Sequence, residues 1–147
     1  MDQVEVKRWV IQHRFHPANG WHVTTHIDPS EKQFASWPGC QQWFTQNGVA
    51  MSAHTVFGPA DIVAVLGQQT YIAEVEGDTS KQQSDALYDA LGQLLVVMHG
   101  PPVGRVYALA FPDSPQWQHQ LEKLSGWLRQ TLSLERWLVS VSGVRVL

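Results

Sequence analysis

The sequence predicts an α/β fold in which helices flank a mixed β-sheet. Residues 61–76 contain two β-branched runs joined by a short glycine-containing connection, which is the pattern of a β-hairpin. A helical pattern then extends to about His99 and leads to an apolar run at 105–111. A strand that reaches the next strand through a helix forms a parallel pair with a right-handed crossover. The hairpin and the crossover together therefore require antiparallel and parallel pairs in one sheet.

Length and composition fit a single soluble domain that comprises residues 1–147. The chain has 147 residues, 44% of them hydrophobic and 16% charged, which is too little charge for a disordered chain. Its one cysteine, Cys40, excludes an intramolecular disulfide framework. No apolar run approaches the roughly 18 residues of a membrane span, and the first residues lack a signal-peptide pattern. We therefore expect a cytoplasmic protein with no membrane partner.

The N-terminal region, residues 1–58, is expected to contain strands and short helices. Residues 4–13 mix β-branched and charged side chains, which favours a strand. A turn cluster at 16–20 precedes an alternating run at 21–27, and the two runs are expected to pair as a hairpin. A helix should start near Asp28 and be kinked or divided at Pro38-Gly39.

The core region, residues 59–147, has clearer signals. Strands are expected at 61–66, 70–76 and 105–111, a helix from the turn at 77–80 to about His99, a second helix at 115–131, and a strand or hairpin at 137–147. The first helix is expected to be amphipathic because its apolar residues share one arc at about 100° per residue. Those residues are Ala86, Leu87, Ala90, Leu91, Leu94, Leu95 and Met98.

Three carboxylates are predicted to meet on one face of the hairpin. A turn at Gln68-Gln69 would place Asp61 opposite Glu76 and diagonal to Glu74. Clustered carboxylates repel one another and raise at least one pKa unless a cation lies between them. An oxygen-only ligand set favours Mg²⁺ or Mn²⁺ over zinc. The spacing therefore predicts a divalent metal site, and the alternative is a solvated strand face.

These motifs resemble the PD-(D/E)XK nuclease superfamily, whose fold is restriction-endonuclease-like. The family pattern is an acid at the start of one strand, an acid-x-Lys on the next, and then a helical crossover. Here Asp61 follows Pro59-Ala60, Glu74-Val75-Glu76 lies on the next strand, and the helix that follows carries Gln93. The resemblance covers residues 56–111. It implies a nuclease-like core that hydrolyses nucleic-acid phosphodiester bonds, with DNA as the expected nucleic-acid partner and Mg (or Mn) as cofactor.

The resemblance also implies roles for individual residues. Asp61, Glu74 and the main-chain carbonyl of Val75 would bind the metal. The family usually has lysine at the position that Glu76 occupies here. Certain restriction enzymes of the superfamily also have glutamate at this position. In other members the lysine has moved to a nearby element, and Lys81 is the candidate here. The expected catalytic set is therefore Asp61, Glu74, Glu76 and Lys81.

Three further residues are candidate accessory groups. In the family an acid from a preceding helix often joins the site, and Glu31 is the candidate for that role. Gln93 occupies a position on the crossover helix where the family often has a polar residue. His54 precedes Asp61 by seven residues and is a candidate for the same rim. Gln93 and Lys81 are equally consistent with exposed helix positions.

A second hypothesis is a catalytically inactive module of this fold that acts in binding or assembly. Glu76 in place of lysine, the low basic content and seven tryptophans motivate it. It predicts an apolar surface that oligomerisation covers, so a homodimer is a candidate assembly. A third hypothesis, a histidine-metal enzyme, has little support, because the spacing of His13, His16, His22 and His26 fixes no metal geometry.

The distribution of charge along the sequence indicates where the protein would contact nucleic acid. The net charge of −3 excludes binding through bulk positive charge. Residues 61–89 carry six acidic side chains and one basic side chain, whereas the rest of the chain carries nine basic and seven acidic ones. The acidity is therefore concentrated where the metal is expected, and any contact with phosphate should be local.

Overall fold

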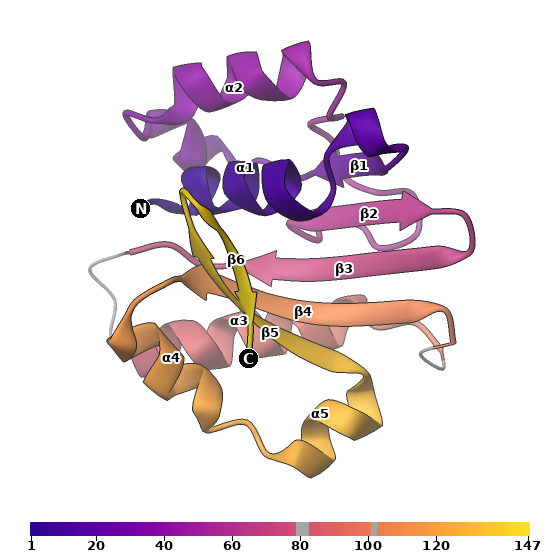
Figure 1. Ribbon diagram of the computed structural model, residues 1–147, viewed down its shortest axis with the longest axis vertical. Helices are drawn as coiled ribbons and strands as arrows, with labels where there is room; N and C mark the ends of the chain where they lie inside the picture. Colours follow the sequence, from indigo (N-terminus) through magenta and orange to yellow (C-terminus); the bar gives the residue numbers. More distant parts are fainter. Residues whose placement is uncertain (79–82, 101–102) are drawn as a thin grey trace.

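One mixed sheet organises the protein. The computed structural model describes residues 1–78, 83–100 and 103–147, and within them six strands form this sheet (Figure 1). The strands are β1 (His22–Thr25), β2 (Ile62–Leu66), β3 (Gln69–Val75), β4 (Arg105–Pro112), β5 (Leu134–Ser140) and β6 (Gly143–Val146), side by side in chain order. β1 to β3 are antiparallel, β3 to β5 are parallel, and β6 is antiparallel to β5. The predicted α/β class and the mixed sheet are confirmed.

Helices cover both faces of the sheet (Figure 1). The described α-helices are α1 (Gln3–Arg14), α2 (Trp37–Gln46), α3 (Gln83–Val97), α4 (Pro115–Glu122) and α5 (Gly126–Leu132), with two 3₁₀-helices, η1 (Pro17–Asn19) and η2 (Pro29–Gln33). α1 and α2 pack on the face that presents Ile62 and Ala64, whereas α3 and α4 pack on the face that presents Val63 and Ile72. Because both faces are covered, the central strands are buried on both sides.

Residues 4–13 form a helix, so the prediction of a strand there was wrong, and β1 pairs with β2 instead of with this segment. The side chain of Asp2 accepts a hydrogen bond from the Glu5 amide, and the side chain of Glu5 accepts one from the Asp2 amide. This reciprocal cap starts α1 at Gln3. Val4, Val10 and Ile11 then fall on one buried side of the helix, and this burial outweighs the strand preference of β-branched residues.

Other boundaries differ in smaller ways. Pro38 lies in the first turn of α2, where a missing amide hydrogen is tolerated, so Pro38-Gly39 does not divide that helix. The helix expected at 115–131 is two helices, because Ser125 caps α5 by accepting a hydrogen bond from the Leu128 amide. The C-terminal segment is the hairpin of β5 and β6.

Thr79, Ser80 and Lys81 lie outside the described residues. None of the described helices combines the length and apolarity needed to cross a membrane.

Gly77 fixes the close contact between the end of β3 and the start of α1. A Cβ atom at this position would lie 2.3 Å from the main-chain nitrogen of Gln3, which is far inside van der Waals contact. The next residue, Asp78, donates its amide to the Met1 carbonyl at 2.8 Å. The segment that follows Glu76 therefore lies directly against the first turn of α1, and this contact brings α1 to the end of β3.

We expect Gly77→Ala to lower the free energy of unfolding by about 1–3 kcal/mol, because the added methyl group meets main chain that cannot yield. The matched control is Gly92→Ala on the exposed side of α3, where an added Cβ has nothing within 4 Å. This control should raise the free energy of unfolding by about 1 kcal/mol through helix propensity. Urea denaturation followed by tryptophan fluorescence measures both. A Gly77→Ala protein as stable as the wild type would show that the contact does not hold α1.

Candidate functional site

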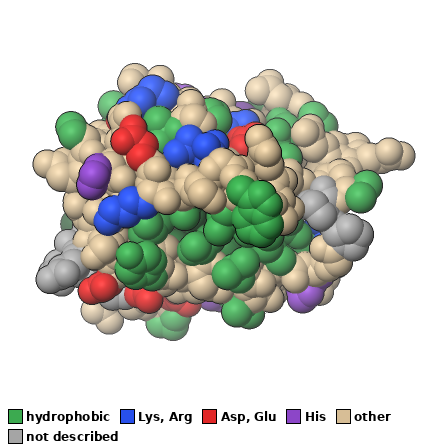
Figure 2. Space-filling view, turned by 90° about the horizontal axis from the view of Figure 1, so that it is seen from below, with side chains coloured by type: hydrophobic (Ala, Val, Ile, Leu, Met, Phe, Trp, Pro, Cys, Tyr) green, Lys and Arg blue, Asp and Glu red, His purple; other side chains and the backbone are tan. Residues whose placement is uncertain are grey.

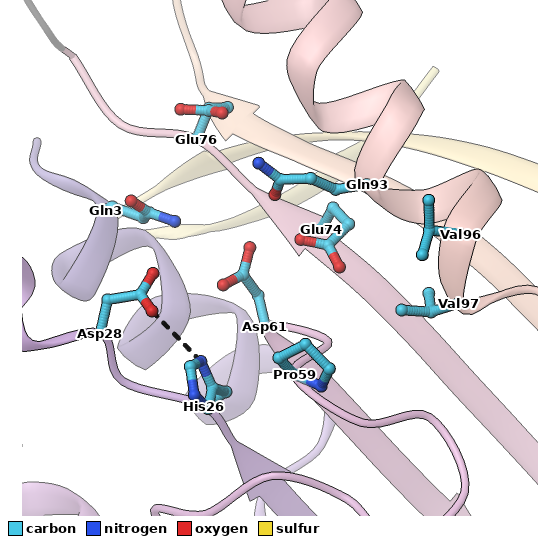
Figure 3. A pocket seen from close by; sticks show the side chains of 10 residues that line it. All are labelled: Gln3, His26, Asp28, Pro59, Asp61, Glu74, Glu76, Gln93, Val96 and Val97. Carbon is cyan, nitrogen blue, oxygen red and sulfur yellow. Dashed lines mark ion pairs between the residues drawn. The ribbon is translucent and has the colours of Figure 1, made fainter.

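A pocket of about 430 Å³ opens where the start of β2, the end of β3 and the C-terminal half of α3 meet (Figure 3). Its lining comprises Gln3, His26, Asp28, Pro59, Asp61, Glu74, Glu76, Gln93, Val96 and Val97. Asp61, Glu74, Glu76 and Gln93 were all predicted as site residues, and the fold brings them to one pocket. Figure 3 shows the side chains of Asp61 and Glu74 converging at its centre.

The pairing of β2 with β3 places Asp61 across from Glu74. The register pairs Leu66 with Gln69 and Ile62 with Ala73, so the residue that precedes Ile62 stands opposite the residue that follows Ala73. The predicted pairing of Asp61 with Glu76 was wrong by two residues. The turn is formed by Gly67 and Gln68, because Gly67 takes the positive φ of 59° that a tight hairpin turn requires.

Both carboxyl groups are buried, so they do not form the solvated strand face that was the alternative interpretation. Asp61 is 5% exposed and Glu74 is 3% exposed. The Oδ2 atom of Asp61 accepts a hydrogen bond from the Val75 amide at 2.8 Å. Its main-chain carbonyl accepts hydrogen bonds from the Thr25 hydroxyl at 2.7 Å and from the His26 amide at 3.2 Å. These contacts fix Asp61 between β1 and β3.

Glu74 is the site residue for which the largest pKa shift is resolved. Burial raises the pKa of its carboxyl group to about 10, and the neighbouring charge of Asp61 and a side-chain hydrogen bond with Asp61 act in the same direction. The nearby ammonium of Lys7 opposes this rise only in part. At neutral pH, Glu74 is therefore protonated and hydrogen-bonded to the Asp61 carboxylate.

Lys7 is the site residue that the sequence did not reveal. Its side chain is fully buried, and its Nζ atom lies 2.9 Å from Oδ1 of Asp61 and 2.8 Å from Oε1 of Glu31. Nζ also donates to the His26 carbonyl at 2.6 Å. Burial alone lowers the pKa of Lys7, but the carboxylates of Asp61 and Glu31 outweigh it, and the pKa lies above its usual value. A charged lysine thus lies directly behind the Asp61–Glu74 pair.

Glu31, the candidate acid from a preceding segment, reaches the site through Lys7. It belongs to η2, is 1% exposed, and accepts hydrogen bonds from Lys7 with both carboxylate oxygens. Its Oε1 atom also accepts the Asp28 amide at 3.0 Å. Burial raises the pKa of Glu31, and Lys7 lowers it by a smaller amount. Glu31 does not line the pocket, so its role is to hold the ammonium.

The other predicted residues occupy different positions. Glu76 is half-buried, and Figure 3 shows its carboxylate away from the Asp61–Glu74 pair, while Gln93 extends from α3 toward the space between them. The carbonyl of Val75, the third expected metal ligand, accepts a hydrogen bond from the Gln3 side-chain amide at 3.0 Å. Lys81, the fourth member of the expected catalytic set, lies outside the described residues.

His54 lines a different pocket, of about 450 Å³, beside β1. Its Nδ1 atom accepts the main-chain amides of Val56 at 3.0 Å and Phe57 at 3.2 Å. Burial lowers its pKa, which keeps the ring neutral and able to accept these hydrogen bonds. In this structure His54 stabilises the turn before β2, and it is absent from the lining of the Asp61 pocket.

The geometry of the Asp61 pocket is the basis on which its function is inferred. In the part of the chain that the structure describes, no group of three or more His, Cys, Asp or Glu side chains is placed to hold a metal ion. The expected ligands are two carboxyl groups and a main-chain carbonyl, which is a smaller set. No family model, curated protein or solved structure matches this chain.

We expect Lys7→Met to lower the free energy of unfolding by about 3–5 kcal/mol, because it leaves the buried carboxylates of Asp61 and Glu31 without their cation. Lys32→Met removes an exposed lysine of η2 and should change stability by no more than about 0.5 kcal/mol. Urea titration followed by tryptophan fluorescence compares the two variants. Equal stabilities would mean that the ion pairs do not hold α1 to the sheet.

Stability should also depend on the titration of Glu74. Because its pKa is raised in the folded state, the proton on Glu74 stabilises the fold below pH 4.5, and this stabilisation is lost as the pH rises toward about 10. The free energy of unfolding should therefore fall by up to about 1.4 kcal/mol per pH unit in this window. Glu31 titrates in the same direction, so the diagnostic quantity is the difference from Glu74→Gln, which should have a shallower slope. Parallel slopes would assign the pH dependence to other groups.

Proposed function

We propose that the protein is a metal-dependent phosphodiesterase that hydrolyses nucleic acid at the Asp61 pocket. The observation that carries this proposal is the pair of buried carboxyl groups, Asp61 and Glu74, side by side at the base of an open pocket. Two acids in such a place are costly unless a proton or a cation lies between them. A proton occupies that place at neutral pH, and a divalent ion is the natural replacement.

The order of elements supports the proposal. The three-stranded antiparallel β1–β3, the crossover through α3 and the parallel β4 reproduce the strand, strand and crossover order of the PD-(D/E)XK pattern. Asp61 immediately precedes β2, and Glu74 and Val75 end β3. Gln93 lies on the crossover helix and lines the same pocket. The family resemblance of the motifs therefore agrees with their positions on the fold.

The charges of the cluster fit a divalent cation. With Glu74 ionised, one ammonium and the carboxylates of Asp61, Glu31 and Glu74 carry a net charge of about −2. One Mg²⁺ or Mn²⁺ ion would neutralise that charge, and an oxygen-only donor set suits either ion. Asp61 and Glu74 would hold the ion, with the Val75 carbonyl as a third ligand after Gln3 turns away from it. The ion would lower the pKa of a bound water and stabilise charge on a phosphate.

The residues of the chain have distinct proposed roles around this pair. Lys7 positions Asp61, because its Nζ atom holds Oδ1 from the buried side. Glu76, half-buried in the lining, is the candidate acceptor of a proton from the attacking water. The amide of Gln93 can donate a hydrogen bond to a phosphate oxygen in the pocket. The catalytic role expected of Lys81 stays a prediction.

A non-catalytic binding module is a second candidate function, and one observation favours it. The oxygens of Asp61 and Val75 that are expected to bind the metal already have partners inside the protein: Oδ1 of Asp61 has Lys7, its Oδ2 has the Val75 amide, and the Val75 carbonyl has Gln3. Such a self-satisfied cluster is also what a structural polar network needs. This candidate predicts neither heat of metal binding nor cleavage.

Glu74→Gln is the variant that separates the two functions. It should preserve the fold at neutral pH, because a neutral amide replaces an already neutral carboxyl group of the same shape. We expect the wild type to bind Mn²⁺ in calorimetry and to cut plasmid or single-stranded DNA with Mg²⁺ or Mn²⁺. Glu74→Gln should bind Mn²⁺ at least about 10-fold more weakly and cut at least about 100-fold more slowly.

The matched control is Glu122→Gln, which makes the same substitution at an exposed position at the end of α4. It should bind and cut like the wild type. Wild-type protein that neither takes up Mn²⁺ nor cleaves these substrates would refute the enzymatic proposal and favour the binding module. Cleavage that is equal in Glu74→Gln would place any activity outside this pocket.

A further inference from the structure

A band of exposed apolar side chains lies on the surface formed by α3 and α5 (Figure 2). Tyr88 and Leu95 of α3 are 62% and 49% exposed, and Trp127 of α5 is 75% exposed. The half-buried Leu91, Leu128 and Leu132 continue the band down to the core between the two helices. Exposed apolar surface of this kind marks an interaction site more often than a solvated one.

The band is separate from the Asp61 pocket, although α3 contributes to both. At about 100° per residue, Tyr88, Leu91 and Leu95 fall on one side of the helix. Gln93 and Val97, which line the pocket, fall on another side. Val96, which also lines the pocket, falls between Asp85 and Asp89 on the helix. The apolar residues of the band and those of the pocket can therefore be tested by separate substitutions.

Charges of opposite sign border the band on its two sides. Asp85 and Asp89 are exposed on α3, whereas Lys123 is exposed between α4 and α5 and Arg129 is half-buried on α5. In Figure 2 a group of acidic side chains lies below the hydrophobic band, and the Lys and Arg side chains nearest to it lie above, together with further acidic side chains. The surface is thus apolar along its middle and acidic on one edge, and the other edge carries Lys123 and Arg129 beside the exposed Glu122, with a net positive charge.

The basic edge contains two neighbouring guanidinium groups, those of Arg129 and Arg136. Burial lowers the pKa of Arg136, the neighbouring charge of Arg129 lowers it further, and the charge of Glu122 raises it. The two neighbouring guanidinium groups repel each other, and an acidic surface placed near them offsets that repulsion.

We propose that this band is a homodimer interface in which the second copy is related by a two-fold axis that runs along the band. Such an axis lies in the plane of the interface, so it places the basic edge of each copy against the acidic edge of the other. The apolar middle of one copy then covers the apolar middle of its partner. Both copies then use the same surface patch, and the patch is complementary to itself, which is the defining property of an isologous contact.

Trp127 is the expected anchor of this interface. A large exposed aromatic ring beside half-buried leucines offers apolar surface whose burial releases water. Large aromatic residues of this kind contribute much of the binding energy in protein interfaces. The charged edges contribute register and orientation more than affinity. The second copy is favoured over another partner because the acidic and basic edges of this chain already complement each other.

Sedimentation equilibrium of the full chain between low micromolar and several hundred micromolar concentration tests the proposal. We expect a monomer–dimer equilibrium, and Leu95→Glu should raise the dissociation constant at least about 10-fold by placing a charge in the apolar middle. Val141→Glu is the matched control, since Val141 is an exposed valine in the turn between β5 and β6. Circular dichroism checks that each variant is folded.

Charge exchange tests the two-fold arrangement itself. Lys123→Glu alone and Asp85→Lys alone should each weaken the dimer several-fold, and the double variant should recover most of the loss, because each copy then again presents opposite edges. A protein that stays monomeric throughout the range overturns the proposal. A dimer unaffected by Leu95→Glu, or a double variant no tighter than either single variant, overturns it as well.

Discussion

The ammonium of Lys7 is the charge on which the arrangement of the site depends. It lies on α1, yet its partners are Glu31 in η2, the carbonyl of His26 after β1, and Asp61 before β2. Four separate segments of the chain therefore meet at one buried atom. An unpaired charge at this depth would cost several kcal/mol, so the segments must be placed correctly for the protein to fold. The cluster gives the N-terminal half its specific position on the sheet.

The same cluster explains why the pocket has its present electrostatics. Lys7 balances Asp61 from behind, but it does not balance Glu74 as well, and burial then keeps Glu74 protonated. The contact of Gly77 with the first turn of α1 completes the arrangement, because it brings Gln3 to the carbonyl of Val75. The pocket is therefore built by α1 as much as by the hairpin that carries its acids.

The sequence predicts the parts of this structure that depend on local pattern. The hairpin, the crossover helix and the parallel strand each have their own periodicity, and their faces follow from it. The position of Asp61 opposite Glu74 was missed by two residues because Gly67, with its positive φ, takes the turn. α1 was missed because its valines favour a strand, although the Asp2–Glu5 capping box was a readable signal. The role of Lys7 has no local signal, since its partners are 24 and 54 residues away.

The position of Lys7 also limits what it can do in the proposed reaction. An ammonium has three hydrogens to donate. Those of Lys7 are directed at Asp61, Glu31 and the His26 carbonyl, and the side chain is fully buried. It therefore has no proton to offer a substrate in the pocket, so it differs in function from a lysine that contacts phosphate. Lys7 therefore does not supply the catalytic lysine that the PD-(D/E)XK pattern places where this chain has Glu76. Lys7 instead holds Oδ1 of Asp61 from the buried side, which positions that carboxyl group beside Glu74 at the place proposed for a cation.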